Sequence, residues 1–445
     1  MNDARDCPVS TSSTAALAHA EQALWRSVAF YGDAVADLDA AIATDPTWGL
    51  AHVAKADFLL TLTEPSLVPQ ARHLIAAAGP LMAHANARER SHFAATALCA
   101  AGRWREAGAA WDEILLQHPR DLLALNSAHL FDFYRGDALN LRTRIARVLA
   151  QWPIDAPLRP FVLGMYAFGL EECNLYRQAE ETGRRALEAC PQMPWAIHAV
   201  AHVMEMQGRH DEGVRWLRAR EPDWAIDNGL SVHLWWHLAL FHLESLDTAG
   251  ALLLFDAHIG GTASVVNLQW LDCAALLWRL QLLGVDVGPR CQRLAQDWAQ
   301  PVEHAGHYAF NDCHALLALI GSGDLARAQA LLQAAAARAE SEHGDNRAMA
   351  VEVGLPLMHA LLAHAAGDAS TAVRLLYPLR SVAHHFGGSH AQRDLIDQTL
   401  LAAAARDSDK AAGRALLNER RLAKPNTPLT AHWASRLGLR DNVLA

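Results

Sequence analysis

Lysine is nearly absent from this chain of 445 residues: only three of its 38 basic residues are lysine, at positions 55, 410 and 424. Chemistry that depends on a lysine, such as a Schiff base or the lysine of a phosphate-binding loop, therefore has few candidates. The seven cysteines are scattered and never form a C-x-x-C pair, which favours reduced thiols inside a cell.

Long hydrophobic runs are missing as well. No window approaches about 18–20 uninterrupted apolar residues, so we expect no membrane span. The first residues carry no basic segment followed by an apolar one, so we expect no secretion signal. Together with the reduced cysteines, these absences predict a soluble, cytoplasmic protein without a membrane partner.

An excess of basic charge is also lacking. The formal net charge is −10 at pH 7, which gives a nucleic-acid partner no electrostatic support. The sequence contains no Walker loop, Rossmann fingerprint, zinc ribbon or haem-attachment motif. Apolar residues make up 52% of the chain and charged residues 19%, which is enough for a large core and argues against disorder.

What the sequence does contain is a repeated unit. Residues 31–46, 102–119 and 176–191 each carry small and apolar residues at spacings of three and four, and each ends at a proline. The small residues Ala107 and Ala179 occupy equivalent places in two of these units. A period near about 34 residues, with small residues where two helices cross, is the tetratricopeptide (TPR) pattern.

The repeats predict the fold class. Runs of β-branched residues are short, and Ala, Leu, Glu, Arg and Gln dominate, so strands are disfavoured. We expect an all-α, right-handed α-solenoid of about nine to eleven TPR-like helical hairpins. Its expected parts are N-terminal repeats in 1–86, central repeats with a histidine-rich groove in 87–300, and C-terminal repeats that close the superhelix in 301–445.

The 24 histidines include two pairs at helical spacing. His198 and His202 lie four residues apart, with Glu205 on the same face, and His233 and His237 repeat the spacing in the next unit. The first helices of successive repeats run parallel and line the concave wall. We therefore expect His198 level with His233, and His202 level with His237, so that four imidazoles come within reach of one metal ion.

The same wall is expected to carry further imidazole, carboxylate and aromatic groups. A few polar groups in an apolar surround are typical of a small-molecule site. The candidate ligand-binding residues are His92, Tyr166, Glu171, Trp195, His198, His202, His233, Trp236, His237 and His314.

Three functions are compatible with this groove. It binds a small molecule or a peptide tail; or it holds zinc, iron or manganese for a hydrolase or oxidase; or it is an interaction scaffold for a protein partner. In the metal case, His198, His202, His233 and His237 are the ligands, and Glu171 or Glu205 is a ligand or general base. Alternatively, the histidines only hold neighbouring helices in register.

Several longer blocks go beyond the general repeat pattern, at 121–133, 164–172, 198–208, 233–241, 387–394, 419–420 and 424–428. Together they resemble the tetratricopeptide repeat protein 38 family, over about residues 45 to 430. The resemblance implies a cytosolic α-solenoid and brings no defined activity.

One of these blocks, Gly387-Gly-Ser389-His-Ala391, is faintly similar to the Gly-x-Ser-x-Gly turn of serine hydrolases. That turn needs a strand before the serine, and here a helical stretch precedes it. We expect instead that Ser389 begins a helix as a capping box with Gln392, and that the two glycines end the preceding helix.

Overall fold

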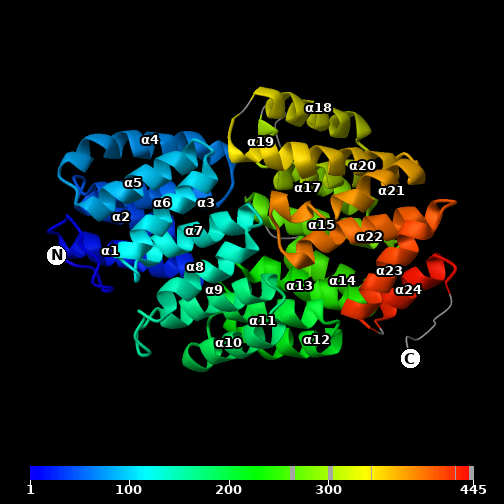
Figure 1. The fold of residues 1–445 in the computed structure, drawn as a ribbon, viewed down its shortest axis with the longest axis horizontal. Helices are drawn as coiled ribbons and strands as arrows, with labels where there is room; N and C mark the ends of the chain where they lie inside the picture. The colour runs from blue at the N-terminus through cyan, green and yellow to red at the C-terminus, as the bar shows by residue number, and fades with distance from the viewer. Residues whose placement is uncertain (261–265, 299–303, 342, 426, 440–445) are drawn as a thin grey trace. The chain divides into compact units, whose positions relative to one another are not determined.

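The computed structural model describes residues 1–260, 266–298, 304–341, 343–425 and 427–439. Within these ranges the chain forms α-helices with short 3₁₀ and π turns, and its only extended pairings are the isolated bridges Asn2–Pro8 and Tyr31–Asn228. The predicted all-α solenoid of helical hairpins is therefore confirmed (Figure 1). The predicted boundary between residues 300 and 301 lies outside the described residues.

The chain divides into two compact units. Unit 1 comprises Met1–Val200 and Asp223–Ser231, and unit 2 comprises Ala201–Pro222 and Val232–Ala445. The division passes through α11 (Pro194–Met206), which is one unbroken helix and is described here as a whole.

Unit 1 is a run of antiparallel hairpins in which α1 packs on α2, α3 on α4, α5 on α6, and α9 on α10. Its helices are α1 (Thr14–Ala29), α2 (Ala34–Thr44), α3 (Gly49–Thr61), α4 (Val68–Ala78), α5 (Ala87–Ala100), α6 (Trp104–Gln117), α7 (Leu122–Tyr134), α8 (Ala138–Leu149), α9 (Arg159–Glu172) and α10 (Tyr176–Ala189), with 3₁₀ turns η1 (Pro65–Leu67) and η2 (Gly79–Ala83). The division also falls within the 3₁₀ turn η3 (Glu221–Asp223).

Unit 2 continues the pattern, with α17 packed on α18, α20 on α21 and α22 on α23. Its helices are α12 (His210–Ala219), α13 (Ser231–Glu244), α14 (Thr248–Leu254), α15 (Asn267–Leu282), α16 (Gly288–Asp297), α17 (Ala309–Gly321), α18 (Leu325–Ser341), α19 (Asp345–Met349), α20 (Leu355–Ala365), α21 (Ala369–Leu379), α22 (His390–Arg406), α23 (Ala411–Ala423) and α24 (Pro428–Arg436), with turns η4 (Phe255–Ile259), η6 (Ala350–Gly354) and η7 (Ala383–Phe386).

A shared turn explains why the hairpins recur. A residue with positive φ closes the turn, for example Gly102 (φ 76°) or Asn174 (φ 60°). Five positions later comes a fully buried small residue, Ala107 or Ala179, where the two helices cross. Positive φ is easiest for glycine and asparagine, and alanine lets two backbones approach closely, so each repeat depends on these two positions. The predicted crossing alanines are thus confirmed.

In unit 2 the C-terminal helices return to a helix far earlier in the chain. The guanidinium of Arg279 on α15 donates to the backbone carbonyl of Ala391 at 2.8 Å, and the indole of Trp278 donates to Thr399 Oγ1 at 2.9 Å. These bonds place α22 beside α15. Charged residues beyond position 390 therefore lie near helices of the central repeats.

One helical stretch, Asp345–Ala365, has a mean hydropathy of 1.4 over a length that could cross a membrane. Half of it is buried inside the fold, where α20 packs on α17 and α21. Burial among other helices accounts for its apolar composition, since a helix enclosed by protein needs few polar residues.

Candidate metal centre

The central helices α11 and α13 are apolar on nearly every side. Pro194 occupies the first turn of α11, where its missing N–H costs no hydrogen bond. Almost every residue of α11 and α13 is buried, including His202 and His237. A buried imidazole must find hydrogen-bond partners or a ligand inside the protein, so the histidines on these helices have defined surroundings.

Two imidazoles of α13 are held by carboxylates. His233 Nδ1 lies 2.9 and 3.1 Å from the two carboxylate oxygens of Asp272 on α15. His237 Nδ1 lies 3.0 Å from Glu205 Oε2 on α11. The other ring nitrogens of the two histidines face each other, with His233 Nε2 and His237 Nε2 3.2 Å apart. The carboxylates thus fix the orientation of both rings.

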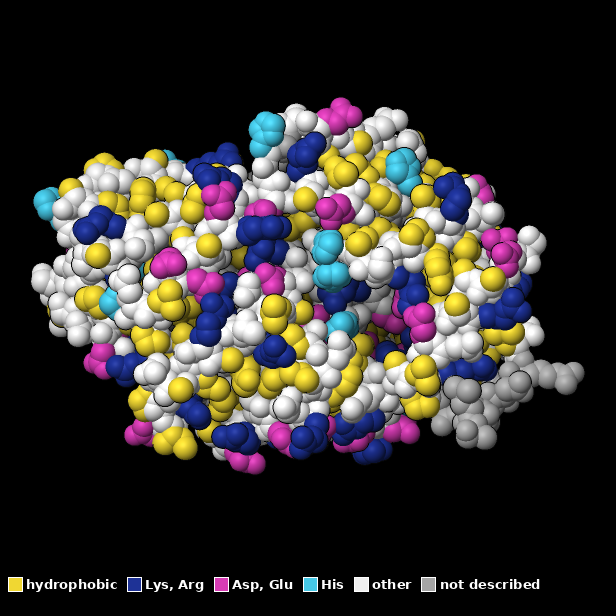
Figure 2. Space-filling view, viewed as in Figure 1, with side chains coloured by type: hydrophobic (Ala, Val, Ile, Leu, Met, Phe, Trp, Pro, Cys, Tyr) yellow, Lys and Arg dark blue, Asp and Glu magenta, His cyan; other side chains and the backbone are white. Residues whose placement is uncertain are grey.

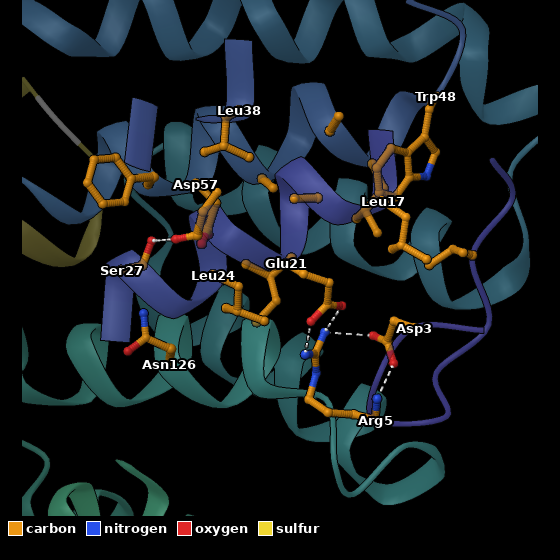
Figure 3. A pocket seen from close by; sticks show the side chains of 18 of the residues that line it. Asp3, Arg5, Leu17, Glu21, Leu24, Ser27, Leu38, Trp48, Asp57 and Asn126 are labelled. Atoms are coloured by element: carbon orange, nitrogen blue, oxygen red, sulfur yellow. Dashed lines mark hydrogen bonds and ion pairs between the residues drawn. The ribbon is translucent and has the colours of Figure 1, made fainter. Parts of the chain in front are cut away.

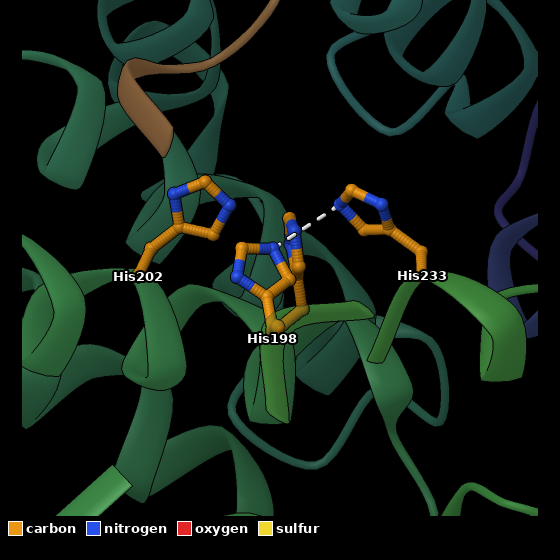
Figure 4. A group of neighbouring side chains, drawn as sticks. His198, His202 and His233 are labelled. Atoms are coloured by element: carbon orange, nitrogen blue, oxygen red, sulfur yellow. Dashed lines mark hydrogen bonds between the residues drawn. The ribbon is translucent and has the colours of Figure 1, made fainter. Parts of the chain in front are cut away.

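His202 of α11 completes the cluster. The ring centroids of His202 and His237 are 4.5 Å apart. His202, His233 and His237, all of unit 2, each offer one ring nitrogen, and these nitrogens lie within 4.8 Å of one another. Figure 4 shows neighbouring imidazoles, among them the labelled rings of His202 and His233. The structure therefore brings three of the four predicted histidines together, and His198 lies one turn before His202 on α11.

Aromatic rings support two of the imidazoles. Trp236 stacks on His233, with ring centroids 5.2 Å apart and planes inclined by 13°. Trp195 stacks on His198 at 5.3 Å. The Arg279 guanidinium lies 5.5 Å from the centre of the Trp236 ring, in a cation–π arrangement. The predicted aromatic residues Trp195 and Trp236 thus position histidines.

A network of buried ion pairs adjoins the cluster. Lys424 Nζ lies 3.1 Å from Glu244 Oε1 and 4.0 Å from Glu205 Oε1. Arg420 pairs with the same Glu244 oxygen and, at 2.9 Å, with Asp394. Glu205 is therefore shared between His237 on one side and Lys424 on the other.

The pKa values of the acids depend on their neighbours. Burial raises the pKa of the Glu205 carboxyl above its ordinary 4.5, and the charges of Lys424 and His202 oppose that rise. Burial also acts on Glu244, but there the charges of Arg420 and Lys424 are stronger and lower its pKa. Of these two acids, Glu205 is the one whose charge is not fully compensated, so an added cation would favour its ionised form.

A small cavity opens within the network. It has a volume of about 20 Å³, enough for one water molecule, and Glu205, Glu244, Arg279, Asp394 and Gln398 provide its polar walls. Apolar side chains close its other sides. The cavity gives the buried acids a place for a hydrating water.

The remaining predicted site residues lie on other helices. His92 on α5 pairs with Asp121, with Nε2 2.8 Å from the carboxylate, and connects α5 to the start of α7. Tyr166 is half-buried and Glu171 fully buried, both on α9 of unit 1. His314 faces the carbonyl of Phe310 in its own helix at 2.8 Å, and burial lowers its pKa to about 4.

The turn at residues 387–392 is a capping box, as predicted. Ser389 accepts a hydrogen bond from the backbone N–H of Gln392, whose side chain accepts from the Ser389 N–H. Gly387 and Gly388 both have positive φ. The serine begins α22, which carries Asp394 into the ion network.

Four residues beside the histidines were not predicted as site residues: Asp272, Arg279, Arg420 and Lys424. Asp272 and Arg279 had a usable signal, because they are the charged residues of the otherwise apolar helix α15. Buried charges in an apolar helix need partners. Arg420 and Lys424 had no such signal, since they follow the last clear repeats.

The surface carries mixed charge. On the face shown in Figure 2, Lys and Arg side chains are interspersed with Asp and Glu. Many are paired at short range, such as Arg290 with Asp256 at 2.6 Å. Interspersed pairs of this kind give no extended field of one sign.

No protein-family model matches the chain. Among solved structures, it is similar to a monomeric mutant of IFIT1 with Gppp-AAAA, with 13% identity, a TM-score of 0.41, and coverage of 94% of this chain and 99% of that one. It is also similar to the human IFIT1 dimer with PPP-AAAA, with 13% identity, a TM-score of 0.39, and coverage of 94% and 98%. Neither likeness identifies a ligand for this chain.

Proposed function

We propose that this helical-repeat protein binds one divalent transition-metal ion, zinc foremost, through the imidazoles of α11 and α13. One observation carries the proposal: His233 Nε2 and His237 Nε2 lie 3.2 Å apart while the Nδ1 atom of each ring faces a carboxylate.

The protons of the two rings explain why this arrangement calls for a cation. An ionised carboxylate only accepts hydrogen bonds, so Nδ1 of His233 and of His237 carries the hydrogen. Each Nε2 then presents a lone pair, and the two lone pairs point at each other. A proton or a metal ion between the rings removes the repulsion.

The distances favour a metal ion. Zinc binds imidazole nitrogen at about 2.1 Å, so two nitrogens on a tetrahedral ion lie about 3.4 Å apart. The observed separation of His233 Nε2 and His237 Nε2 is 3.2 Å, and His202 adds a third nitrogen nearby. An all-imidazole set suits zinc or iron better than manganese, which prefers oxygen ligands.

The two carboxylates lie where groups that hydrogen-bond to metal-bound histidines are usually found. A metal-bound histidine usually donates its other N–H to a carboxylate, which orients the ring and makes it a stronger ligand. Asp272 does this for His233, and Glu205 does it for His237. In our proposal Glu205 therefore orients a ligand and is neither a ligand nor a base itself.

The ion would serve as an attachment point in the predicted groove. Three imidazoles leave one tetrahedral position, which can take a carboxylate of a peptide tail or of a small molecule. A water molecule in that position would be acidified, as in hydrolytic zinc sites, and this favours hydrolysis as the second candidate function. If His198 is the fourth ligand, the site is closed and holds α11 and α13 together.

Metal analysis of matched variants tests the proposal. The purified protein, without an affinity tag, is incubated with Zn²⁺, Fe²⁺ or Mn²⁺, freed of excess ion, and measured by inductively coupled plasma mass spectrometry. His233→Ala removes one proposed ligand. His242→Ala is its control, because His242 lies on the same helix and faces Asp247 at 2.7 Å, outside the cluster.

We expect about one equivalent of zinc in the unaltered protein and in His242→Ala, and a loss of binding in His233→Ala with the helical circular dichroism retained. A protein that retains none of the three ions would refute the proposal. Equal binding by His233→Ala would refute it too. His198→Ala then distinguishes the three-imidazole site from the closed four-imidazole site. The substitution should lower the zinc affinity only if His198 is the fourth ligand.

A further inference from the structure

A second cavity lies within unit 1, away from any residue used so far. It has a volume of about 60 Å³ and is enclosed by α1, α2, α3, α7 and the N-terminal segment (Figure 3). At about 10–15 Å³ for each water-sized volume, it has room for about four to six non-hydrogen atoms. Most of the wall is apolar, with Leu24, Leu38, Trp48 and Phe58 among its side chains.

Asp57 is the exceptional residue of this wall. Its side chain comes from α3, and the residue is only 4% exposed. One carboxylate oxygen, Oδ2, accepts a hydrogen bond from the Ser127 hydroxyl. The other, Oδ1, is buried and has no hydrogen-bond partner in the part of the chain that the structure describes. A buried acceptor without a partner is costly, so it marks a place where a ligand would gain by donating.

The charges around the cavity indicate which kind of donor fits. Three carboxylates and two guanidiniums line it: Asp3, Glu21 and Asp57 against Arg5 and Arg88. Arg5 pairs with Asp3 at 2.8 Å and with Glu21 at 2.6 Å, and Arg88 lies 3.9 Å from Asp3. Asp57 takes part in none of these pairs. A cation beside Asp57 would therefore be the counter-ion of a carboxylate that has none among these residues.

The cavity has a way in. Leu17, Phe58 and Asn126 line it but are only partly buried, so part of the rim reaches the surface. The opposite wall is formed by Asp3, Arg5 and Val9 of the N-terminal segment, which is held by the Arg5–Glu21 pair.

We propose that this cavity binds a small organic ammonium ion, with the ammonium group donating to Asp57 Oδ1 and a short hydrocarbon chain lying against the apolar wall. A primary ammonium has three N–H donors, and its chain of about four carbons matches the volume. The apolar side chains that line the cavity suit the hydrocarbon chain of such an ion.

The acidity of Asp57 agrees with this assignment. Burial raises the pKa of the Asp57 carboxyl to about 7, while the hydrogen bond from Ser127 lowers it slightly. The cavity wall therefore carries a carboxyl group whose pKa lies near neutral pH. A bound ammonium would favour the ionised form, since an opposite charge nearby stabilises it.

Calorimetric titration with n-butylammonium at pH 8 tests the proposal, and 1-butanol is the neutral probe of similar shape. We expect a Kd of about millimolar for the amine and binding weaker by about thirtyfold or more for the alcohol. Asp57→Asn should weaken amine binding by a similar factor. Asp39→Asn should leave it unchanged, because Asp39 is an exposed partner of Lys55 outside the cavity.

Two results would overturn the proposal. One is equal binding of amine and alcohol, which would make the cavity a non-selective apolar void. The other is unchanged amine binding in Asp57→Asn, which would place the amine elsewhere. The Asn variant is expected to fold, because it removes a buried ionisable group and keeps its shape, and its helical circular dichroism and melting curve would verify this.

Discussion

Asp272 offers the sharpest test of how the histidine cluster is built. Its carboxylate is 2% exposed, and both oxygens lie within 3.1 Å of His233 Nδ1. Replacement by asparagine keeps the shape and removes the charge. An amide can also present its NH₂ group to Nδ1, which would move the ring hydrogen to Nε2 and abolish that nitrogen as a ligand.

The size of the effect follows from the role of Asp272. Loss of a carboxylate that orients a metal-bound histidine lowers metal affinity about 10–100-fold. At about 1.4 kcal/mol for each factor of ten, this is about 1.4–2.8 kcal/mol. The value agrees with the worth of a hydrogen bond to a charged group, about 1.5–3 kcal/mol. We therefore expect Asp272→Asn to bind zinc 10–100-fold more weakly.

The assay is a competition titration of Zn²⁺ between the protein and a chromophoric chelator at constant pH and ionic strength. Asp247→Asn is the control, because Asp247 accepts from His242 Nδ1 at 2.7 Å in a similar pair outside the cluster. Asp247 also caps α14, a role that asparagine fulfils equally well. We expect the control to match the unaltered protein.

A double-mutant cycle makes the prediction refutable. If Asp272 acts through His233, then Asp272→Asn should not weaken further the residual zinc affinity that the competition titration measures in a His233→Ala background. Equal zinc affinities of Asp272→Asn and the unaltered protein, with binding lost in His233→Ala, would show that the carboxylate does not orient the ligand. A full additional loss in the double variant would show that Asp272 acts by another route.

Three further predictions concern stability. Burial raises the pKa of Asp57 to about 7, above its ordinary 3.8, so its ionisation costs stability as the pH rises from about 4 to 7. Asp57→Asn should therefore raise the free energy of unfolding at pH 8 by about 2–4 kcal/mol and change it little at pH 4, as measured by urea titration. Arg420→Met leaves Glu244 buried with one cation fewer and should cost about 3–5 kcal/mol, much of it recovered by adding Glu244→Gln. Gly213→Ala places a Cβ 2.2 Å from the Phe241 ring and should lower stability by about 1–3 kcal/mol in thermal melts.

The fold could be predicted because its signals are local. Ala107 and Ala179 are spaced by the repeat itself, and the positive-φ turn five residues earlier belongs to the same short segment. The pairing of His198 with His202 and of His233 with His237 needs only the helical period. Sequence alone therefore predicted which side chains share a face, and repeat stacking predicted that the two pairs meet.

The carboxylates around the cluster were harder to predict. Asp272 lies 39 residues after His233, one repeat further along the chain. Which imidazole it contacts depends on how far α15 is shifted along its axis relative to α13. His92 was predicted for the groove by the same reasoning. It has the burial expected of a groove residue, and its imidazole pairs with Asp121, which caps α7 and lies 29 residues further along the chain.

The basic side of the site had no periodic signal at all. Lys424 and Arg420 reach Glu244 across 180 and 176 residues, through helices that lie after the regular repeats. Glu205 connects these charges to the histidines, because one oxygen faces His237 at 3.0 Å and the other lies 4.0 Å from Lys424. The lysine helps to keep this buried carboxylate ionised, and an ionised carboxylate is what leaves the lone pair on His237 Nε2. In our proposal, the metal affinity of the α11–α13 histidines therefore depends on a C-terminal residue that no repeat places beside them.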